Sequence, residues 1–416
     1  MKYAVVTFGC RVNQSDSLQI EERMLASGAV AAAPERADLV VVNTCSVTAT
    51  ADQGARQTIR RIARDNPGAR IVVTGCYATR RPDEIAALPN VSDVVCNDDK
   101  PRLLRVISSF DGPCGSLIEP GVAGRTAYTL RVQTGCAEPC SYCIIPATRG
   151  APRSAAIDDV LGGVARAAAA GFREIALTGV HLGSYGRDLE PRASLVDLLR
   201  RLDARAPASP QERVLFRVSS LEPMDCSMEI VDLVAASRRF APHFHLPLQH
   251  ASNRILASMR RPYTIEYYAA LVARVRARMP HASIGSDVIV GFPGETDEDF
   301  DALAAYLERS PLTHLHVFPY SDRPGTAAST FGGRAPGAVV RERARRVREI
   351  GARLADRFRT SQVGTTHDAL TIEDGSLAVT GNYLKVRIPP GRSRNEWVRI
   401  KVASGDPLAG VVVENR

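Results

Sequence analysis

Three of the nine cysteines lie within eight residues, as Cys136, Cys140 and Cys143, directly after a strand-like run at residues 128–133. Three thiolates at this spacing can wrap one face of an iron–sulfur cubane and leave a fourth iron without a protein ligand. The amino and carboxylate groups of a substrate can chelate such an open iron. A structural zinc site instead wants four closed ligands, usually two C-x-x-C pairs, and no second pair lies nearby. The loop therefore indicates a reactive iron–sulfur cluster.

Three further cysteines, Cys10, Cys45 and Cys76, each follow the carboxyl end of a strand-like run. Ligands bind at this edge in open α/β sheets, so the three thiols are predicted to converge on one shared cluster. The alternative is three half-buried thiols that pack as small hydrophobic side chains. Small or turn-forming neighbours, such as Gly9 and Gly75, favour the shared site because they bring the backbone close to a ligand.

The remaining cysteines and the histidines show no such pattern. Cys96, Cys114 and Cys226 each stand alone and are interpreted as buried or incidental thiols. The eight histidines give no metal-ligand spacing, and those on strand-like runs are expected to pack in the core or to make ordinary hydrogen bonds.

Strand-like and helical runs alternate along most of the chain, which predicts an α/β fold. In the first hundred residues, strands are expected at 2–8, 37–42, 69–74 and 91–96, with helices at 15–27 and 50–64. This order predicts an open, doubly wound parallel sheet. A second series has strands at 128–133, 174–178, 214–219, 243–248, 283–290 and 314–319. Helical runs follow these strands, so the series predicts a partial (β/α)6 barrel, two units short of a full barrel.

An arginine-rich run at residues 341–359 predicts a connecting helix with a solvated face. Strand-like runs then return at 369–372, 377–379, 383–388 and 397–402, which suffices for a small C-terminal β-barrel. We therefore expect three domains, at residues 1–115, 122–360 and 363–416.

Composition and charge narrow the function further. The 416 residues are 45% hydrophobic and 24% charged, which excludes a wholly disordered, collagen-like or coiled-coil chain. The net charge of +8 favours a polyanionic partner. No apolar stretch approaches the length of a membrane span, and the first residues read as a strand instead of a leader. A cytoplasmic protein with no membrane partner is expected.

The cysteine loop resembles that of the radical S-adenosylmethionine enzymes, and over its full length the chain is similar to the methylthiotransferases. The stretches that carry this resemblance are residues 9–14 (GCRVNQ), 135–150, 181–186 (HLGSYG), 259–264 (MRRPYT) and 318–321 (FPYS). Ser15-Asp16-Ser17 stands where Tyr-Glu-Ser is more usual in that family.

The resemblance implies two [4Fe-4S] clusters and S-adenosyl-L-methionine as cofactors. Cys136, Cys140 and Cys143 would hold the cluster that binds S-adenosylmethionine, and Cys10, Cys45 and Cys76 the auxiliary cluster that carries the inserted sulfur. Removal of a hydrogen atom from an unactivated ring carbon needs such a cofactor, because no acid or base of a protein can do it. The residues expected to contact S-adenosylmethionine are Gly179, Ser219, Glu222 and Gly291.

Within the family, the closest branch methylthiolates the adenine 2-carbon of threonylcarbamoyladenosine-37 in tRNA. Other branches act on isopentenyl-adenosine in tRNA or on an aspartate of a ribosomal protein. Arg323, within the run RPGT, resembles the tRNA-acting branches, and the C-terminal barrel is similar to a TRAM domain. The expected RNA-binding residues are Arg323, Lys385, Arg387, Arg392, Arg394, Trp397, Arg399 and Lys401, because phosphate contacts with a stacking ring suit single-stranded RNA.

The implied partners are the anticodon loop of tRNA and a low-potential electron donor such as flavodoxin or ferredoxin, but not DNA. Two other classes stay open from the sequence. A radical S-adenosylmethionine RNA methyltransferase would not use the first cysteine trio for sulfur, and a non-catalytic cluster carrier would need neither barrel signatures nor a basic tail.

Overall fold

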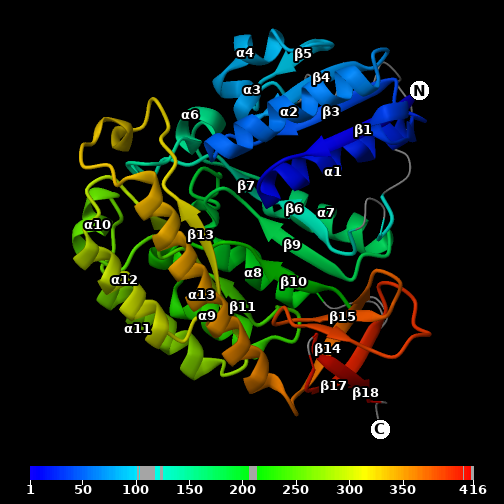
Figure 1. Ribbon diagram of the computed structural model, residues 1–416. Coiled ribbons are helices and arrows are strands. Elements are labelled where there is room, and N and C mark those ends of the chain that lie inside the picture. Colours follow the sequence, from blue (N-terminus) through cyan, green and yellow to red (C-terminus); the bar gives the residue numbers. More distant parts are fainter. Residues whose placement is uncertain (101–102, 104–117, 122–124, 206–212, 406, 414–416) are drawn as a thin grey trace.

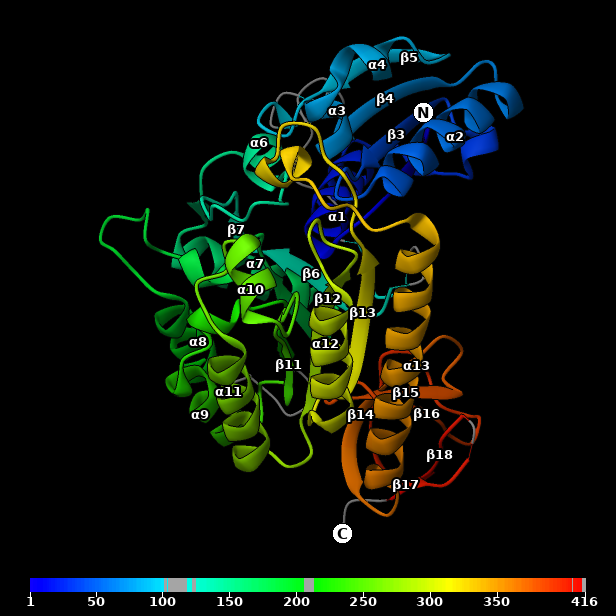
Figure 2. The ribbon, with the colours of Figure 1, turned by 60° about the vertical axis from the view of Figure 1, so that its left-hand side comes forward.

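The computed structural model describes residues 1–100, 103, 118–121, 125–205, 213–405 and 407–413. Three units follow one another along the chain. The N-terminal sheet and the C-terminal barrel lie at opposite ends of a central partial barrel (Figures 1 and 2). The expected boundary near residues 115–122 falls largely outside the described residues, as does Cys114.

The N-terminal unit is a five-stranded parallel sheet with the order β2-β1-β3-β4-β5. Its strands are β1 (Lys2–Thr7), β2 (Val30–Ala31), β3 (Leu39–Thr44), β4 (Arg70–Gly75) and β5 (Val91–Val95). Its helices are α1 (Arg11–Ala26), α2 (Ala49–Asp65), α3 (Cys76–Arg80) and α4 (Pro82–Ala86). The β3 run Leu-Val-Val-Val is buried throughout because helices cover both faces of the sheet, α2 one and α1 the other.

The central unit confirms the predicted six-stranded partial barrel. Its parallel strands form two sheets, β6-β9-β10 and β11-β12-β13, and residues Phe216 and Phe240 bridge the two sheets. The strands are β6 (Tyr128–Arg131), β9 (Glu174–Thr178), β10 (Leu215–Val218), β11 (His243–His245), β12 (Ser283–Val290) and β13 (His314–Pro319). The run expected as one strand at 128–133 is interrupted at Val132, and β7 (Gln133–Thr134) then pairs with β8 (Arg153–Ser154) across the cysteine loop.

Helices cover the outside of the partial barrel. They are α7 (Ile157–Ala169), α8 (Leu195–Ala204), α9 (Met228–Ala236), α10 (Asn253–Ser258), α11 (Ile265–Arg278), α12 (Asp297–Arg309) and α13 (Gly337–Gln362). The short helix α6 (Ile145–Arg149) instead follows the cysteine loop and packs against α3 of the N-terminal unit. Capping boxes at Ser194 and Thr296 fix the starts of α8 and α12. Short 3-10 turns lie at Pro34–Arg36, Leu182–Ser184, Pro223–Asp225 and Ala327–Thr330.

The arginine-rich helix α13 is longer than predicted and is not solvated along its whole face. It packs against β13 and α12, and Arg343 is buried with its Nη1 2.6 Å from Glu295 Oε1. The other arginines of the run are mostly exposed, as expected for a helix that lies on the surface of the barrel.

The C-terminal unit is a closed five-stranded barrel with the order β14-β15-β16-β18-β17, which confirms the predicted small β-barrel. Its strands are β14 (Thr366–Ile372), β15 (Leu377–Thr380), β16 (Lys385–Arg387), β17 (Trp397–Ala403) and β18 (Ala409–Val412). The sequence pattern did not predict β18. In the part of the chain that the structure describes, no helix combines the length and the apolar character needed to cross a membrane.

Candidate active site

Cys10, Cys45 and Cys76 meet at the carboxyl edge of the N-terminal sheet. Cys10 is the residue before α1, Cys45 directly follows β3 and Cys76 is the first residue of α3 after β4. These strands are neighbours in the sheet, so the shared location predicted from the sequence follows from the topology.

Close backbone packing holds the first two of these cysteines together. Gly9 has φ +91°, and a Cβ atom placed on it would lie 2.5 Å from Cys45 Cβ and 2.6 Å from Cys45 Sγ. The buried Asn13 side chain donates from Nδ2 to the carbonyls of Phe8 (2.8 Å) and Thr44 (2.9 Å). The ends of β1 and β3 are therefore fixed relative to each other by the polypeptide itself.

The sulfur atoms of this trio receive hydrogen bonds. The Val47 backbone N–H donates to Cys45 Sγ at 3.5 Å, and Asn97 Nδ2 lies 3.6 Å from Cys76 Sγ. Burial raises the pKa of the Cys45 thiol to about 12, and the nearby Cys76 and Cys10 contribute to the rise. Metal binding would have to supply the positive charge that makes this buried thiolate stable.

A buried group of charges lies beside the same trio. Asp16 forms ion pairs with Lys100, Arg131 and Arg149, and these three cations lower the pKa of its carboxyl although burial acts in the opposite direction. Burial alone would lower the pKa of Arg149. Electrostatic attraction to Cys76, Asp16 and Cys10 is stronger and raises the pKa of Arg149. Arg149 and Arg131 belong to the central unit, so Asp16 joins that unit to the N-terminal sheet.

Cys136, Cys140 and Cys143 lie in the loop between β7 and α6. The Glu138 backbone N–H lies 3.4 Å from Cys136 Sγ, and Arg261 Nη1 donates to Cys140 Sγ at 3.2 Å. Arg261 is buried and also pairs with Glu222. Burial raises the pKa of the Cys143 thiol to about 12. Like the first trio, this loop supplies hydrogen-bond donors to sulfur, although its three cysteines are only partly buried.

A protonated histidine faces Cys136. Burial disfavours the charge of His181, but hydrogen bonds to Asp225 and Cys136 outweigh burial and raise the pKa of His181 to about 10. Its Nε2 lies 2.7 Å from Asp225 Oδ2, and its Nδ1 lies 3.8 Å from Glu138 Oε1. Two cations, His181 and Arg261, therefore contact the sulfur-bearing loop.

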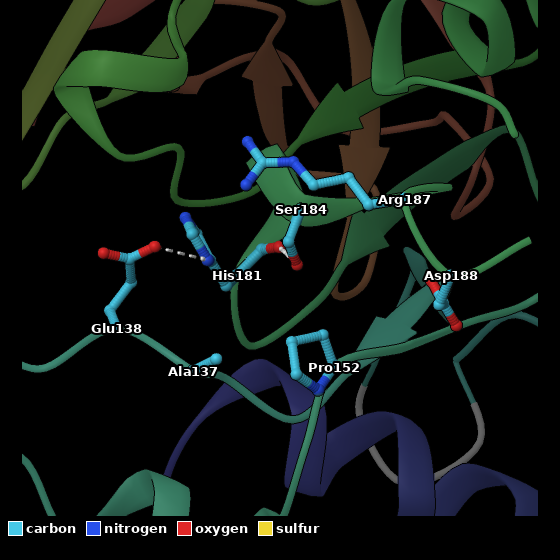
Figure 3. A pocket seen from close by; sticks show the side chains of 7 residues that line it. All are labelled: Ala137, Glu138, Pro152, His181, Ser184, Arg187 and Asp188. Carbon is cyan, nitrogen blue, oxygen red and sulfur yellow. Dashed lines mark hydrogen bonds and ion pairs between the residues drawn. The ribbon is translucent and has the colours of Figure 1, made fainter.

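A cavity of about 310 Å³ opens next to this loop (Figure 3). Figure 3 shows the Glu138 carboxylate directed at the His181 ring. The lining residues are Ala137, Glu138, Pro152, His181, Ser184, Arg187 and Asp188. The cavity is lined by Ala137 and Glu138, the two residues that directly follow Cys136.

The two trios are neighbours. Helix α6, which begins two residues after Cys143, packs against α3, which begins at Cys76. Asn97 joins the two sides, since its Nδ2 contacts both Cys76 Sγ and the carbonyl of Thr148 on α6 (2.8 Å).

The spacing of the sulfur atoms distinguishes between metal types. Three thiolates on one zinc ion lie about 3.8 Å apart, given Zn–S bonds of about 2.3 Å and tetrahedral angles. Among the described residues, only His245, Asp287 and His316 bring three possible ligand atoms within 4.8 Å of one another. The sulfurs of each trio are therefore spread more widely than one zinc ion requires, as suits a cluster in which each sulfur binds a different iron. All eight described cysteines are free of disulfide bonds.

The residues predicted to contact S-adenosylmethionine have different surroundings. Gly179 follows β9 in tight contact with Leu182 and Gln133, and the Ser219 hydroxyl after β10 is buried without a hydrogen-bond partner. Glu222 lies next to the cysteine loop through Arg261. Gly291 follows β12, but its N–H donates to Glu295 Oε2 (2.8 Å) and it packs against α13.

Some of the residues predicted to bind RNA contact other parts of the chain, and others are exposed. Arg323 is buried with its Nη1 2.7 Å from Asp52 Oδ2. The Trp397 indole N–H donates to the Arg213 carbonyl, and the Arg213 guanidinium carbon lies 4.5 Å from the centre of the Trp397 ring. Arg394 donates to the carbonyls of Glu373 and Gly121. Arg392 pairs with Glu396 at 2.8 Å. Of the residues predicted to bind RNA, four are exposed and have no ion pair with any described residue: Lys385, Arg387, Arg399 and Lys401.

Sequence reasoning missed the groups that surround the cysteines. Arg149 and Arg261 lie inside stretches that carried the family resemblance, but nothing in the pattern assigned them a role. The cluster of His245, Asp287 and His316 was also missed, because its members come from three different strands and share no sequence spacing.

Two family models match the chain, one over the N-terminal unit and one over the central unit. Residues 2–97 match the family model described as Uncharacterized protein family UPF0004, and residues 130–307 match that of the Radical SAM superfamily. Among solved structures, the radical S-adenosylmethionine methyltransferase TsrM from Kitasatospora setae aligns with a TM-score of 0.57 at 18% identity, over 79% of this chain and 76% of that chain. The site and the fold thus define a radical SAM enzyme.

Similar curated proteins narrow the class. The threonylcarbamoyladenosine tRNA methylthiotransferase MtaB of Aquifex aeolicus is 35% identical over 97% of this chain and 100% of its own length. That of Bacillus subtilis is 34% identical over 91% of this chain and 88% of its own length. A tRNA-2-methylthio-N(6)-dimethylallyladenosine synthase of Corynebacterium efficiens is 32% identical over 90% of this chain and 75% of its own length. The chain belongs to the radical SAM methylthiotransferase family.

Proposed function

We propose that this chain methylthiolates threonylcarbamoyladenosine-37 of tRNA at the adenine 2-carbon. The observation that carries the proposal is the meeting of two cysteine trios across α3 and α6, in a chain whose full-length relatives include the MtaB enzymes. A methyltransferase would have no use for the sulfur chemistry of the first trio. A carrier of clusters would not need the cavity beside the second.

Two [4Fe-4S] clusters and S-adenosyl-L-methionine are the proposed cofactors. Cys136, Cys140 and Cys143 would hold one cluster, and Cys10, Cys45 and Cys76 the other. When bound, these groups supply the radical and sulfur chemistry that the protein's own side chains lack.

The protein's own groups tune and position these cofactors. Arg261 Nη1 and the Glu138 N–H donate to sulfur in the second trio, and His181 holds a proton beside Cys136. Donors and cations around the sulfurs stabilise the anionic thiolates. The partner-free Ser219 hydroxyl and Glu222 are the proposed contacts for S-adenosylmethionine, together with Gly179, while Gly291 would act through its backbone.

The proposed RNA-binding surface is narrower than the sequence suggests. It consists of Lys385, Arg387, Arg399 and Lys401, which are exposed on the C-terminal barrel. Arg323, Arg394 and Trp397 join the units of the protein instead. The domains would span residues 1–115, 122–360 and 363–416, and a flavodoxin or ferredoxin would supply electrons. A tRNA substrate places the proposed activity in the cytoplasm.

Mass spectrometry of tRNA nucleosides tests the proposed function. Cells that lack the gene should lose 2-methylthio-threonylcarbamoyladenosine, and wild-type protein should restore it. The Cys140→Ala variant should fail to restore it, while Cys96→Ala, at a lone cysteine, should succeed. Loss of the methylthio mark on isopentenyl-adenosine instead would assign the chain to the branch of the Corynebacterium enzyme.

A further inference from the structure

A polar cluster lines the inner side of the partial barrel on β11, β12 and β13. His245 Nε2 lies 2.8 Å and His316 Nδ1 lies 3.1 Å from Asp287 Oδ1. Both distances are those of ordinary hydrogen bonds, which account for the close approach of the three groups without a metal ion. Hydrogen bonding to Asp287 raises the pKa of His316, against the effects of burial and of nearby Arg11.

The pattern of β13 shows that this cluster faces an open lumen. Leu315 and Val317 pack against the main hydrophobic core, whereas His316 and Phe318 point to the other side and are exposed. The side chain of His316 is 58% exposed although it lies on a strand of the barrel. The His316 ring is therefore open to solvent.

The lumen lies close to both cysteine trios. Ile289, two residues beyond Asp287 on β12, belongs to the apolar cluster against which Tyr142, the neighbour of Cys143, packs. Two residues along a strand correspond to about 6.6 Å. From the other trio, Arg11 follows Cys10 directly and reaches the same lumen, where its charge acts on His316 and His243.

Arg11 is a cation without a counter-ion. It has no ion pair with any carboxylate of the described residues, and it donates to Tyr383 Oη, with its guanidinium carbon 5.9 Å from the ring centroid. The other arginine here, Arg217, is neutralised by Glu174 at 2.9 Å and lies 3.7 Å from the Tyr383 ring. A partly buried guanidinium that lacks an anionic partner is suited to bind one from outside.

We propose that Arg11 and His316 form the subsite for the carboxylate of the threonylcarbamoyl arm, with the exposed Phe318 ring against the adenine. This inference rests on the proposed function. The arm ends in an anion, whereas an isopentenyl arm is uncharged and would leave Arg11 without an anionic partner in the lumen. The acidic arm can form a charge-assisted hydrogen bond with Arg11. An apolar arm would displace water from Arg11 without replacing the hydrogen bonds of that water, so the subsite selects the acidic nucleoside. Asp287 Oδ1 lies 3.1 Å from His316 Nδ1 and orients the ring.

The test uses reconstituted full-length protein and two anticodon stem-loop RNAs. One carries threonylcarbamoyladenosine-37, and the other carries the same arm with a neutral carboxamide in place of the carboxylate. Dissociation constants and rates of methylthiolation are measured for wild type, Arg11→Gln, His316→Asn and the control Arg60→Gln, whose side chain is exposed on α2.

Wild type and Arg60→Gln should bind the acid at least about tenfold more tightly than the amide, which corresponds to about 1.4 kcal/mol. Arg11→Gln and His316→Asn should bind both RNAs equally, at the level of the amide. Iron content is measured in every variant, so that loss of a cluster is distinguished from loss of carboxylate binding.

Two failures can be told apart. If wild type methylthiolates the threonylcarbamoyl RNA but does not distinguish acid from amide, or if both variants keep the preference, the carboxylate subsite is wrong and the proposed function stands. If wild type modifies only an isopentenyl-adenosine RNA, the proposed function itself is wrong.

Discussion

The two cysteine trios are built in opposite ways. Cys136, Cys140 and Cys143 come from one short loop, whereas Cys10, Cys45 and Cys76 come from the ends of three strands and meet only when the sheet forms. The loop trio is tuned by arginine and histidine side chains, and the strand-end trio by Asn97, a backbone N–H and buried ion pairs. A local motif can be read from sequence, but the strand-end trio depends on the integrity of the fold around it.

The largest expected difference between the trios is chemical. Wild type should bind about eight irons per chain, and Cys140→Ala and Cys76→Ala about four each, because each substitution removes one ligand of one cluster. Cys140→Ala should abolish S-adenosylmethionine cleavage, whereas Cys76→Ala should retain cleavage but lose sulfur insertion. Iron analysis and product chromatography measure both, with Cys96→Ala as control. Equal loss of cleavage in both variants would contradict separate roles.

Removal of the charge of Asp16 should destabilise the protein strongly. The Asp16→Asn variant leaves Lys100 and Arg149 buried without their counter-ion, which typically costs about 3–5 kcal/mol. Denaturant unfolding should show this loss, and the auxiliary cluster should be depleted before the radical cluster. Asp301→Asn, in an exposed pair with Arg346, should change stability by less than about 1 kcal/mol. A small effect at Asp16 would mean that water reaches the buried cations.

Single donors to sulfur should have intermediate effects that differ between the trios. Arg261→Lys removes the bond to Cys140 Sγ and disturbs the pair with Glu222, so cleavage of S-adenosylmethionine should fall by about 10- to 100-fold. Asn97→Ala removes a longer contact to Cys76 and should lower cluster retention by less than about tenfold. The exposed Arg260, changed to lysine, is the matched control for Arg261. The comparison is overturned if Asn97→Ala proves the more damaging variant.

The smallest predicted effect concerns α1, which begins beside Cys10. Burial raises the pKa of Glu21 from 4.5 to about 7, with Arg125 opposing the rise and Glu22 adding to it. The folded state therefore binds this proton more tightly than the unfolded state, and that stabilisation is complete below about pH 4.5 and disappears as the pH rises through about 7.

Thermal unfolding at pH 4.5 and pH 8 measures this dependence. The Glu21→Gln variant should lose the part of the pH dependence that Glu21 contributes, so its melting temperature should fall less than that of wild type between the two values. Glu35→Gln, at an exposed position, should behave as wild type. If the melting temperature of Glu21→Gln falls as much as that of wild type between pH 4.5 and pH 8, other carboxyl groups cause the pH dependence.

The sequence predicted what depends on local spacing and on strand order. The cysteine loop, the six parallel strands and the small barrel follow from such patterns, and strands β9, β12 and β13 have the predicted bounds. The edge strand β2 and the barrel strand β18 were missed because both are short and mostly exposed. The interior clusters around Asp16 and Asp287 could not be predicted, because their members are distant in sequence and are joined only by tertiary packing. For the same reason, Trp397 looked like a free ring when it is in fact covered by Arg213.

Tyr383 gives the C-terminal barrel a part in the central lumen. This one side chain, from the turn between β15 and β16, meets Arg11 of the first unit and Arg217 of the second, and Gly381 in the same turn accepts a hydrogen bond from Arg217 at 2.7 Å. A chain shortened to end with α13 would lose Tyr383 and Gly381, so Arg11 and Arg217 would be more exposed to water. The C-terminal barrel therefore helps to form the lumen of the central unit and does not act only as a separate RNA-binding domain.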